Sequence, residues 1–473
     1  MRVCILGAGI GGLTAAYDLA RQGYHVTVAE SAPVVGGLAS GFRDSRWEWP
    51  LERFYHHLFE TDTALRKLVD EIDFTAQLFF KKPITAQWYQ GRGYPLDGAL
   101  PVLRYPGLPL LDRLRLGVST AWLKYVDSNW QALEQVTAAD YIRKHAGEKV
   151  YEAIWRPLLV GKFGPYADQV NMAWLWARLR ARSFQLGYFT GGFQAFADAL
   201  LGQVIRHGAD VRLDTPVHTL TQLAEGWQVQ FGSATEPFDA VLVTGAPALL
   251  RRLVPTLPPE YLGGVDNLRS MGAVVLTVAL KHPLTGGLYW VNTPKDQFPF
   301  LALVEHTNFV DRQHYGGDHL IYCGDYLEPS HEYFQMSKTQ LLERFMPAFK
   351  QVNPAFDPSW VRDVWLHREA YAQPIVTVGH SKNIPPIGTP LPGLFWASMS
   401  QVYPWDRGTN FAVEIGRNAA AELTTYATRI RMSGGGVGAI ADPVWVRRTP
   451  APAPDAPDAP AAPNTPQQET NDV

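Results

Sequence analysis

Glycines near the start of the chain have the spacing that binds a phosphate group. Gly7, Gly9 and Gly12 stand in the order GxGxxG, directly after the apolar, strand-like residues 2–6, and residues 13–22 follow with helical spacing. In such a turn the first glycine permits a tight bend, the second lets the backbone approach a pyrophosphate, and the third lets helix and strand pack closely. The free N–H groups of the helix N-terminus then attract the pyrophosphate.

A carboxylate follows where the ribose of a dinucleotide would lie. Residues 24–29 have the pattern of a second strand, and Glu30 ends it, 18 residues after Gly12. This acid can accept hydrogen bonds from a ribose hydroxyl. An ordinary glycine turn lacks this combination of strand, helix, strand and acid. The stretch therefore predicts a βαβ unit that binds a dinucleotide, and Gly11 belongs to the same turn.

Residues 47–62 bring together aromatic side chains, four acids and two adjacent histidines. In an extended segment His56 and His57 would point to opposite sides, which makes them a poor pair of metal ligands. His57 is instead a candidate for handling a proton or contacting a ligand, and a buried, hydrogen-bonded histidine is the alternative. The chain has no CxxC, HExxH, P-loop or GxSxG motif, and we predict no metal site.

Further candidates come from the strand-like segments between residues 274 and 324, over which a helix at residues 337–352 is expected. A sheet covered by a helix suits the wall of a pocket. Tyr289, Trp290, Glu305 and His306 are the candidates for contacts with a substrate, and a plain core or surface role is the alternative for each.

A second glycine pair, Gly36-Gly37, follows six residues after Glu30. It resembles the second glycine turn of flavoproteins of the glutathione-reductase-like superfamily. More narrowly, it resembles the branch that holds flavin amine oxidases, phytoene desaturases, protoporphyrinogen oxidases and UDP-galactopyranose mutases. The resemblance implies that FAD is the cofactor and that this turn approaches its phosphates and flavin. Many relatives carry Arg after the pair, where this chain has Leu38.

Two later segments extend the resemblance. Residues 191–217 match the order of glycine pair, helix, turn and strand, and in the branch the backbone of the residue matching Val217 holds the adenine edge. Residues 404–410 lead into a helix at 411–426, whose N-terminus is implied to face the N1/O2 edge of the flavin. A helix N-terminus stabilises negative charge there. The residues implied to contact the cofactor in this segment are Asp406, Gly408, Thr409 and Asn410; Asp406 is a candidate replacement for the acid that many relatives carry at the position of residues 397–398.

The resemblance implies an α/β fold, in which a glutathione-reductase-like, Rossmann-type FAD-binding domain is interleaved with an α+β substrate domain. The expected FAD-binding parts are 1–78, 186–262 and 387–430. The expected substrate-domain parts are a mostly helical insert at 79–185 and a sheet at 263–386. Residues 431–473, which are rich in glycine and then in proline, are expected to be a flexible tail.

The composition limits the class of protein. The net charge is −3, and no clustered basic stretch predicts a nucleic-acid partner. The chain has two cysteines, which favours a reducing, cytoplasmic location. No run approaches 18 apolar residues, so we predict no transmembrane segment, and peripheral contact with a membrane stays open. The sequence does not indicate an oligomeric state.

These observations lead to a preferred function and three alternatives. The preferred one is an FAD-dependent oxidoreductase, similar to amine oxidases, that accepts a hydride at flavin N5 from a small organic substrate. The first alternative is a nucleotide-sugar mutase, which is favoured by a local resemblance at residues 57–62 and by Arg178, Arg180 and Arg182. The others are a nicotinamide enzyme that uses only the first glycine turn, and a flavin-binding protein without turnover.

Overall fold

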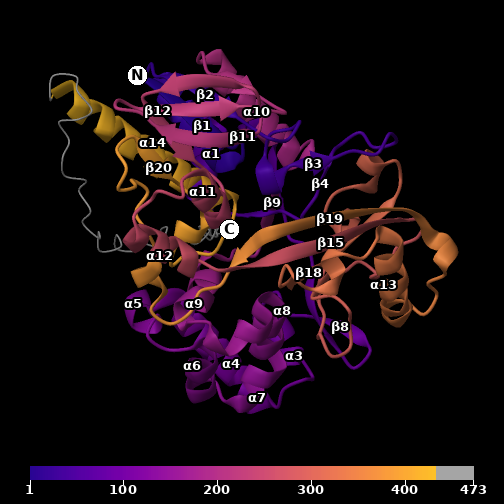
Figure 1. The fold of residues 1–473 in the computed structure, drawn as a ribbon. Coiled ribbons are helices and arrows are strands. Elements are labelled where there is room, and N and C mark those ends of the chain that lie inside the picture. Colours follow the sequence, from indigo (N-terminus) through magenta and orange to yellow (C-terminus); the bar gives the residue numbers. More distant parts are fainter. Residues whose placement is uncertain (433–473) are drawn as a thin grey trace, which may run out of the picture.

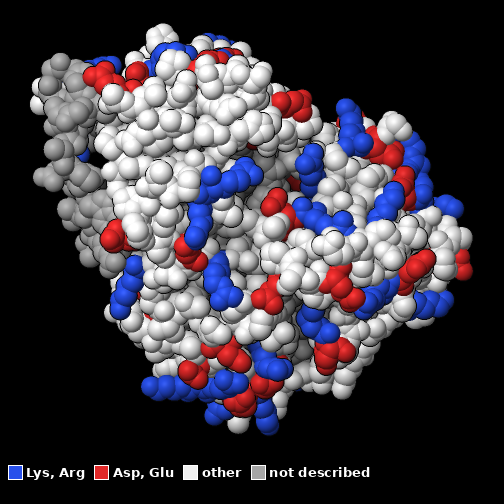
Figure 2. Space-filling model, viewed as in Figure 1, with Lys and Arg blue, Asp and Glu red and all other residues white. Residues whose placement is uncertain are grey.

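The computed structural model describes residues 1–432. The tail expected beyond residue 432 lies outside the described residues. Figure 1 shows one body above, which holds the two ends of the described chain, a second body with a large sheet to the right, and helices below. On the face in Figure 2 the Lys/Arg and Asp/Glu side chains are interspersed, so that no broad field of one sign covers it.

The upper body is built around a five-stranded parallel sheet. Its strand order is β10-β2-β1-β14-β20, and every neighbouring pair runs parallel. The strands are β1 (Arg2–Leu6), β2 (His25–Ala29), β10 (Asp210–Arg212), β14 (Ala240–Val243) and β20 (Leu394–Trp396). Segments nearly 400 residues apart thus share one sheet, and the predicted Rossmann-type α/β fold is confirmed.

Three helices cover one face of this sheet. They are α1 (Ile10–Arg21), α10 (Gly192–Arg206) and α14 (Thr409–Met432), and their apolar sides join the strands in one core. The opposite face is covered by a second, antiparallel sheet and two helices. Those elements are β11 (Val217–Gln222), β12 (Trp227–Phe231), β13 (Ala234–Phe238), α11 (Pro247–Leu253) and α12 (Pro259–Asn267).

Backbones of α1 and α14 touch because both helices have glycine at the crossing. A Cβ added at Gly416 would lie 2.4 Å from the carbonyl oxygen of Gly11, and one added at Gly11 would lie 3.1 Å from the carbonyl oxygen of Ala412. Side chains at these positions would force the helices apart. The glycines therefore bring the first turn of α14 directly against the first turn of α1.

The second body is a seven-stranded sheet of order β19-β15-β18-β17-β16-β7-β8. Helix α13 (Lys338–Val352), close to the predicted helix, packs its apolar side on one face. The strands are β7 (Thr85–Tyr89), β8 (Arg92–Pro95), β15 (Ser270–Leu280), β16 (Trp290–Asn292), β17 (Ala302–Glu305), β18 (His319–Leu327) and β19 (Val361–Pro374). β7 and β8 form an antiparallel hairpin and are the two strands at one edge of this sheet.

The insert below the two bodies in Figure 1 is helical, and it shares an apolar core with one face of the large sheet. Asn171 and Thr137 start two of its helices with side-chain caps. The helices are α3 (Ala99–Arg104), α4 (Leu110–Tyr125), α5 (Trp130–Leu133), α6 (Ala138–His145), α7 (Glu148–Val150), α8 (Arg156–Phe163) and α9 (Met172–Ala181). Shorter elements connect the bodies: β3 (Gly41–Phe42), β4 (Leu51–Glu52), β5 (Leu58–Phe59), α2 (Thr63–Glu71), β6 (Leu78–Lys81) and β9 (Leu186–Phe189).

A buried carboxylate lies between these connecting elements and α10. Glu52 accepts hydrogen bonds from the backbone N–H of Phe193 (2.7 Å) and from the hydroxyl of Tyr188 (2.6 Å). Burial raises the pKa of Glu52 to about 7, even though both hydrogen bonds act to lower it. The carboxyl group therefore keeps its proton in the folded protein at pH values where an unfolded chain releases it.

The first prediction concerns the helix crossing. We expect Gly416→Ala to lower the free energy of unfolding by about 1–3 kcal/mol, because the new methyl group meets the backbone of α1. Gly117→Ala in α4 is the matched control: a Cβ there meets nothing within 4 Å, so the better helix former should stabilise the protein slightly. Thermal unfolding followed by circular dichroism checks both. Shifts of the same sign would contradict the proposed close approach.

The second prediction concerns Glu52 and pH. Its folded-state pKa is raised, so its stabilising contribution is full below about pH 4.5 and is lost as the pH rises through about 7. When the pH is raised from about 5 to about 8, the thermal midpoint of the wild type should therefore fall relative to that of Glu52→Gln. Glu225→Gln, at an exposed position, is the control. A pH-independent difference would refute the assignment.

Candidate cofactor and substrate site

Packing within the protein requires glycine at two positions of the first glycine turn, Gly7 and Gly12, and does not require it at Gly9. A Cβ at Gly7 would lie 2.6 Å from Thr244 Oγ1, and a Cβ at Gly12 would lie 2.0 Å from the carbonyl oxygen of Gly7. A Cβ at Gly9 would meet only the Cα of Gly37, at 3.9 Å, and the φ of Gly9 is −67°, which any residue adopts. Gly9 thus leaves open a space that the polypeptide does not fill. A ligand that approaches the backbone fits this space.

The second glycine turn lies directly against the first. The N–H of Gly36 donates a hydrogen bond to the carbonyl oxygen of Ala8 (2.9 Å), and Gly9 and Gly36 form a parallel bridge. The φ of Gly36 is +109°, in the region that favours glycine. Gly37 approaches so closely that an added Cβ would lie 3.1 Å from the Cα of Gly9. Two motifs 24 residues apart in the sequence therefore form one surface of backbone N–H groups.

Glu30 is held at the end of β2 by its own surroundings. The N–H of Ala8 donates to Glu30 Oε2 (2.7 Å), and the N–H of Ala32 donates to Oε1 (2.9 Å). The N–H of Thr215 donates to the main-chain carbonyl of Glu30 (2.7 Å), which places the start of β11, at Val217, beside the same turn. The carboxylate is thus fixed next to the glycine turn and keeps lone pairs for further donors.

The segment before α14 ends at the same place. The carbonyl oxygen of Gly408 accepts a hydrogen bond from the N–H of Ala412 (3.0 Å). The carbonyl oxygen of Ala412 in turn lies against Gly11. Thr409 and Asn410 are buried. The side chain of Asn410 accepts the N–H of Leu65 (3.0 Å) and donates to Glu414 (3.0 Å), so that it joins α2 to α14. The three separated parts of the upper body thus meet at the glycine turns.

Asp406 joins this segment to the helical insert. Its carboxylate forms an ion pair with Arg178 of α9 and accepts hydrogen bonds from Trp174 Nε1 (3.1 Å) and Gln373 Nε2 (3.2 Å). Burial alone would raise the pKa of Asp406, but the charges of Arg178, Lys162 and Arg407 lower it overall. The ribityl contact expected for Asp406 stays a prediction, because both of its oxygens already have partners in the substrate domain.

A cavity lies where the second glycine turn meets the large sheet. Leu38 contributes to its wall from the turn, and β15, β18 and β19 contribute from the sheet. Its lining residues are Leu38, Phe54, Tyr55, His56, Ala273, Val275, Asp325, Tyr326, Ala372 and Arg407. The cavity therefore has a mostly aromatic and aliphatic wall and two charged groups, which is the usual character of a small-molecule site.

Two charged residues line the cavity, Arg407 and Asp325. Arg407 donates to Gln373 Oε1 (3.1 Å) and to the hydroxyl of Tyr326, which are both neutral acceptors. Lys162, which is buried behind Tyr326, has its ammonium group 4.7 Å from the centre of that ring. Burial, and then the charges of Arg178 and Arg407, place the pKa of Lys162 well below its usual value. The other lining charge, Asp325, is paired with Lys295.

The four predicted catalytic residues are not among the described residues that line this cavity. Trp290 contacts one of the lining residues: its ring packs edge-on against the ring of Tyr55, with 4.9 Å between the ring centres. The ring centre of His57 lies 6.1 Å from that of Trp290. Burial lowers the pKa of His57 to about 3, so the ring is neutral near pH 7. Its Nδ1 is buried and has no hydrogen-bond partner among residues 1–432, as expected of an atom that faces a ligand or water.

Tyr289 and His306 lie deeper in the molecule. Tyr289 packs against Phe309, and His306 Nε2 hydrogen-bonds the hydroxyl of Tyr315 (3.0 Å). Burial lowers the pKa of His306 to about 3. Glu305 accepts the N–H of Thr285 (2.7 Å) and closes a loop, which is a structural role. No contact of Tyr289 or His306 with a substrate follows from these positions, and their catalytic role stays a prediction.

Sequence reasoning did not select Lys162, Arg407, Tyr55 or Tyr326 for the site. Lys162 and Tyr326 each stand on a segment without a recognisable motif. Tyr55 lies inside the aromatic stretch that did attract attention, and Arg407 lies inside the predicted flavin segment. In the sequence, the aromatic stretch points to Tyr55 and the predicted flavin segment points to Arg407.

Comparisons with known proteins agree with this architecture. A protein of Synechococcus elongatus named as a probable zeta-carotene desaturase is 27% identical over 330 residues, which are 59% of this chain and 66% of that protein. The chain spans less than two thirds of the length of the curated relatives that it matches. An oxidoreductase from Methanosarcina mazei is similar in structure, with a TM-score of 0.69 and 17% identity over 89% of this chain and 100% of the other. A reduced UDP-galactopyranose mutase gives a TM-score of 0.67 and 16% identity, over 92% and 98%.

At these identities the structural likeness shows the fold alone. The family is shown by a different finding: the model of the flavin containing amine oxidoreductases matches residues 10–424. That range includes α1, the second glycine turn, the residues that line the cavity and the first two thirds of α14, up to residue 424. The chain therefore belongs to the flavin containing amine oxidoreductase family.

Proposed function

We propose that this protein binds FAD and oxidises a small organic substrate that is held in the cavity beside the second glycine turn. The observation that carries the proposal is the convergence of both glycine turns and the start of α14, with an open space at Gly9. Membership of the flavin oxidoreductase family supports the same assignment. Bound FAD supplies a group that accepts a hydride at N5.

The protein's own residues would hold the cofactor by its polar parts. The backbone N–H groups of Gly11 and Gly12 stand at the N-terminus of α1, where they favour a pyrophosphate. Glu30, which is already oriented by Ala8 and Ala32, is free to accept a ribose hydroxyl. The N-terminus of α14 has the polarity that stabilises negative charge on a neighbouring ring.

The cavity supplies the substrate side of the site. Tyr55, Tyr326 and Phe54 provide flat, apolar wall that excludes water, and Arg407 provides a cation whose hydrogen-bond partners are neutral. We infer a substrate with an aromatic or aliphatic body and an electron-rich or anionic group. Near neutral pH, His56 and His57 act as uncharged rings, because burial lowers the pKa of His56 to about 4 and that of His57 to about 3.

A nucleotide-sugar mutase is the second candidate, favoured by the positive charge at the cavity and by the sequence resemblance at residues 57–62. Two of the three arginines on which this candidate rested have other partners. Arg178 pairs with Asp406, and Arg180 donates to the carbonyl oxygen of Asp127 (3.2 Å). Arg407 is the arginine that lines the cavity. Arg182, the third of these arginines, is also not among the residues that line the cavity. The mutase candidate is therefore left with Arg407 at the cavity, an arginine that the sequence did not select.

The third prediction tests the cofactor site at Gly9. We expect Gly9→Ala to keep the stability of the cofactor-free protein, because the methyl group meets no protein atom closer than 3.9 Å. The same methyl group would occupy the approach of the pyrophosphate, so the flavin content of the purified protein should fall at least about ten-fold. Absorbance and the fluorescence of flavin released by heat measure it.

Gly202→Ala, in α10 with nothing within 4 Å of the added Cβ, is the matched control and should retain full flavin content. Equal flavin content in Gly9→Ala and the wild type would refute the placement of the cofactor. A colourless wild-type protein that binds NAD and cannot be reconstituted with FAD would refute the cofactor itself.

The fourth prediction separates the two candidate reactions. For an oxidoreductase, an amine, polyprenoid or porphyrinogen substrate should bleach the oxidised flavin under anaerobic conditions. For a mutase, sugar nucleotides should leave the oxidised flavin unbleached, and turnover should require flavin reduced beforehand. A stopped-flow screen with both flavin states decides between them.

A further inference from the structure

The outer face of α4 is apolar. Six large apolar side chains follow one another along it at helical spacing, and all are exposed: Leu110, Leu111, Leu114, Val118, Trp122 and Tyr125. Leu111 and Val118 are each 70% exposed, and Tyr125 is 69% exposed. A surface helix normally turns such a stripe toward the core. Water-exposed apolar area of this extent marks a surface that binds something.

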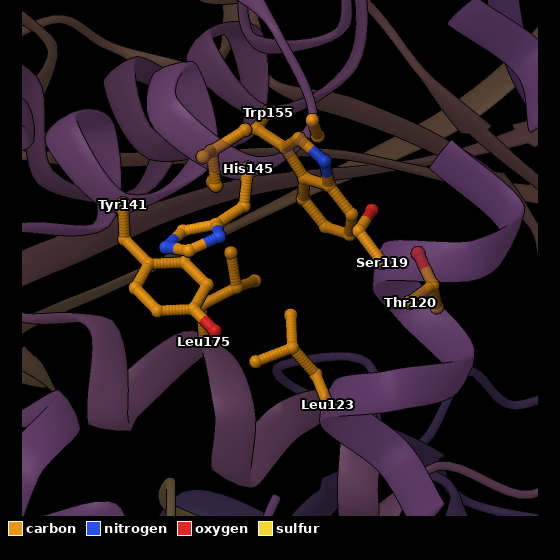
Figure 3. A pocket seen from close by; sticks show the side chains of 9 residues that line it. Ser119, Thr120, Leu123, Tyr141, His145, Trp155 and Leu175 are labelled. Carbon is orange, nitrogen blue, oxygen red and sulfur yellow. The ribbon is translucent and has the colours of Figure 1, made fainter. Parts of the chain in front are cut away.

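The inner face of α4 is already packed. Leu116 and Leu123 belong to the buried core cluster of the helical insert. Ser119 and Thr120 line a small pocket together with Trp155, Tyr141 and His145 of the neighbouring helical segments (Figure 3). The exposed stripe is therefore apolar area in addition to the apolar side that α4 buries.

Neighbouring elements extend the same face. Arg113 ties α4 to α3 through the carbonyl oxygen of Leu103 (2.7 Å), and Leu100 of α3 is 55% exposed. Near the other end of α4, the exposed ring of Phe184 has the ammonium group of Lys124 5.8 Å from its centre. We call this combined outer surface of α3, α4 and Phe184 the α4 face.

The charged side chains of residues 99–126 indicate what kind of surface could cover the α4 face. Residues 99–126 contain four basic side chains and one acidic side chain, although the whole chain has a net charge of −3. The acidic one, Asp112, is buried and forms an ion pair with Arg115, whose side chain is still 61% exposed. Arg104 is exposed, and Lys124 is half-buried and donates to the carbonyl oxygen of Arg182. A second copy related by a two-fold axis would oppose these cations with themselves, which is unfavourable. A surface with negative charge outside and hydrocarbon beneath matches both the basic side chains and the exposed apolar stripe.

We propose that the α4 face docks on the surface of an anionic phospholipid bilayer. Leu111, Leu114 and Val118 enter the boundary between headgroups and acyl chains, as the apolar side of an interfacial helix does. Trp122 and Tyr125 lie at headgroup level, and Arg104, Arg115 and Lys124 contact lipid phosphates. Within residues 1–432, no helix combines the length and the hydropathy that crossing a bilayer requires. The inference does not depend on the proposed function.

The test is flotation of the full-length, flavin-loaded protein with vesicles. The wild type should float with phosphatidylcholine–phosphatidylserine vesicles, bind less to phosphatidylcholine alone and dissociate as salt is raised. Val118→Glu should reduce the bound fraction at least about ten-fold, because it places a carboxylate among the acyl chains and anionic headgroups. Ile205→Glu, at an apolar position of α10 that is 53% exposed and lies off the α4 face, is the matched control and should float like the wild type.

A second variant keeps the test valid if Val118→Glu folds poorly. Arg104→Glu reverses an exposed charge without touching the apolar stripe, and it should weaken binding to anionic vesicles more than binding to neutral ones. Failure of the wild type to float at low salt, or equal flotation of all variants, would overturn the proposal. The proposal would also be overturned if the wild type sedimented as a dimer and Val118→Glu alone converted it to a monomer, because a second copy of the chain would then cover the α4 face.

Discussion

The contact between the backbones of α1 and α14 is the constraint on which the site depends. It exists because Gly11 and Gly416 have no side chains at the crossing of the two helices. The contact brings a helix N-terminus from the last part of the described chain against the glycine turn of the first part. Without it, the two groups of N–H donors would not face the same space, and neither segment could complete a dinucleotide site alone.

A second link joins this cofactor region to the substrate region. Asp406 stands just before α14, and its partners Arg178, Trp174 and Gln373 belong to α9 and β19. The buried carboxylate is stabilised there by the charge of Arg178, and removal of Arg178 would leave its charge less compensated. The helical insert and the large sheet are therefore held in place by the loop that also begins α14. This connection explains why the cavity forms between the two bodies rather than within one of them.

The helical insert has two faces with separate properties. Its inner side, through α8 and α9, contributes Lys162 and Arg178 to the surroundings of the cavity. Its outer side, through α3 and α4, exposes apolar side chains to solvent. One compact core keeps both faces in position. A surface that docks the protein and a region that shapes its pocket can thus share one insert without sharing residues.

The sequence by itself determined the Rossmann-type fold, and it predicted a dinucleotide site at the two glycine turns and the segment before α14. Local rules suffice for these features: a tight turn needs glycine, a pyrophosphate needs free N–H groups, and spacing along the chain fixes both. The same rules could not decide which aromatic and charged side chains surround the cavity. His57, Tyr289, Trp290 and His306 were selected by composition, whereas Tyr55, Tyr326 and Arg407 line the cavity and Lys162 lies behind it. Only the tertiary structure decided this, because those residues come from segments that meet through long-range packing, and burial, which sets their charge, is a property of the assembled fold.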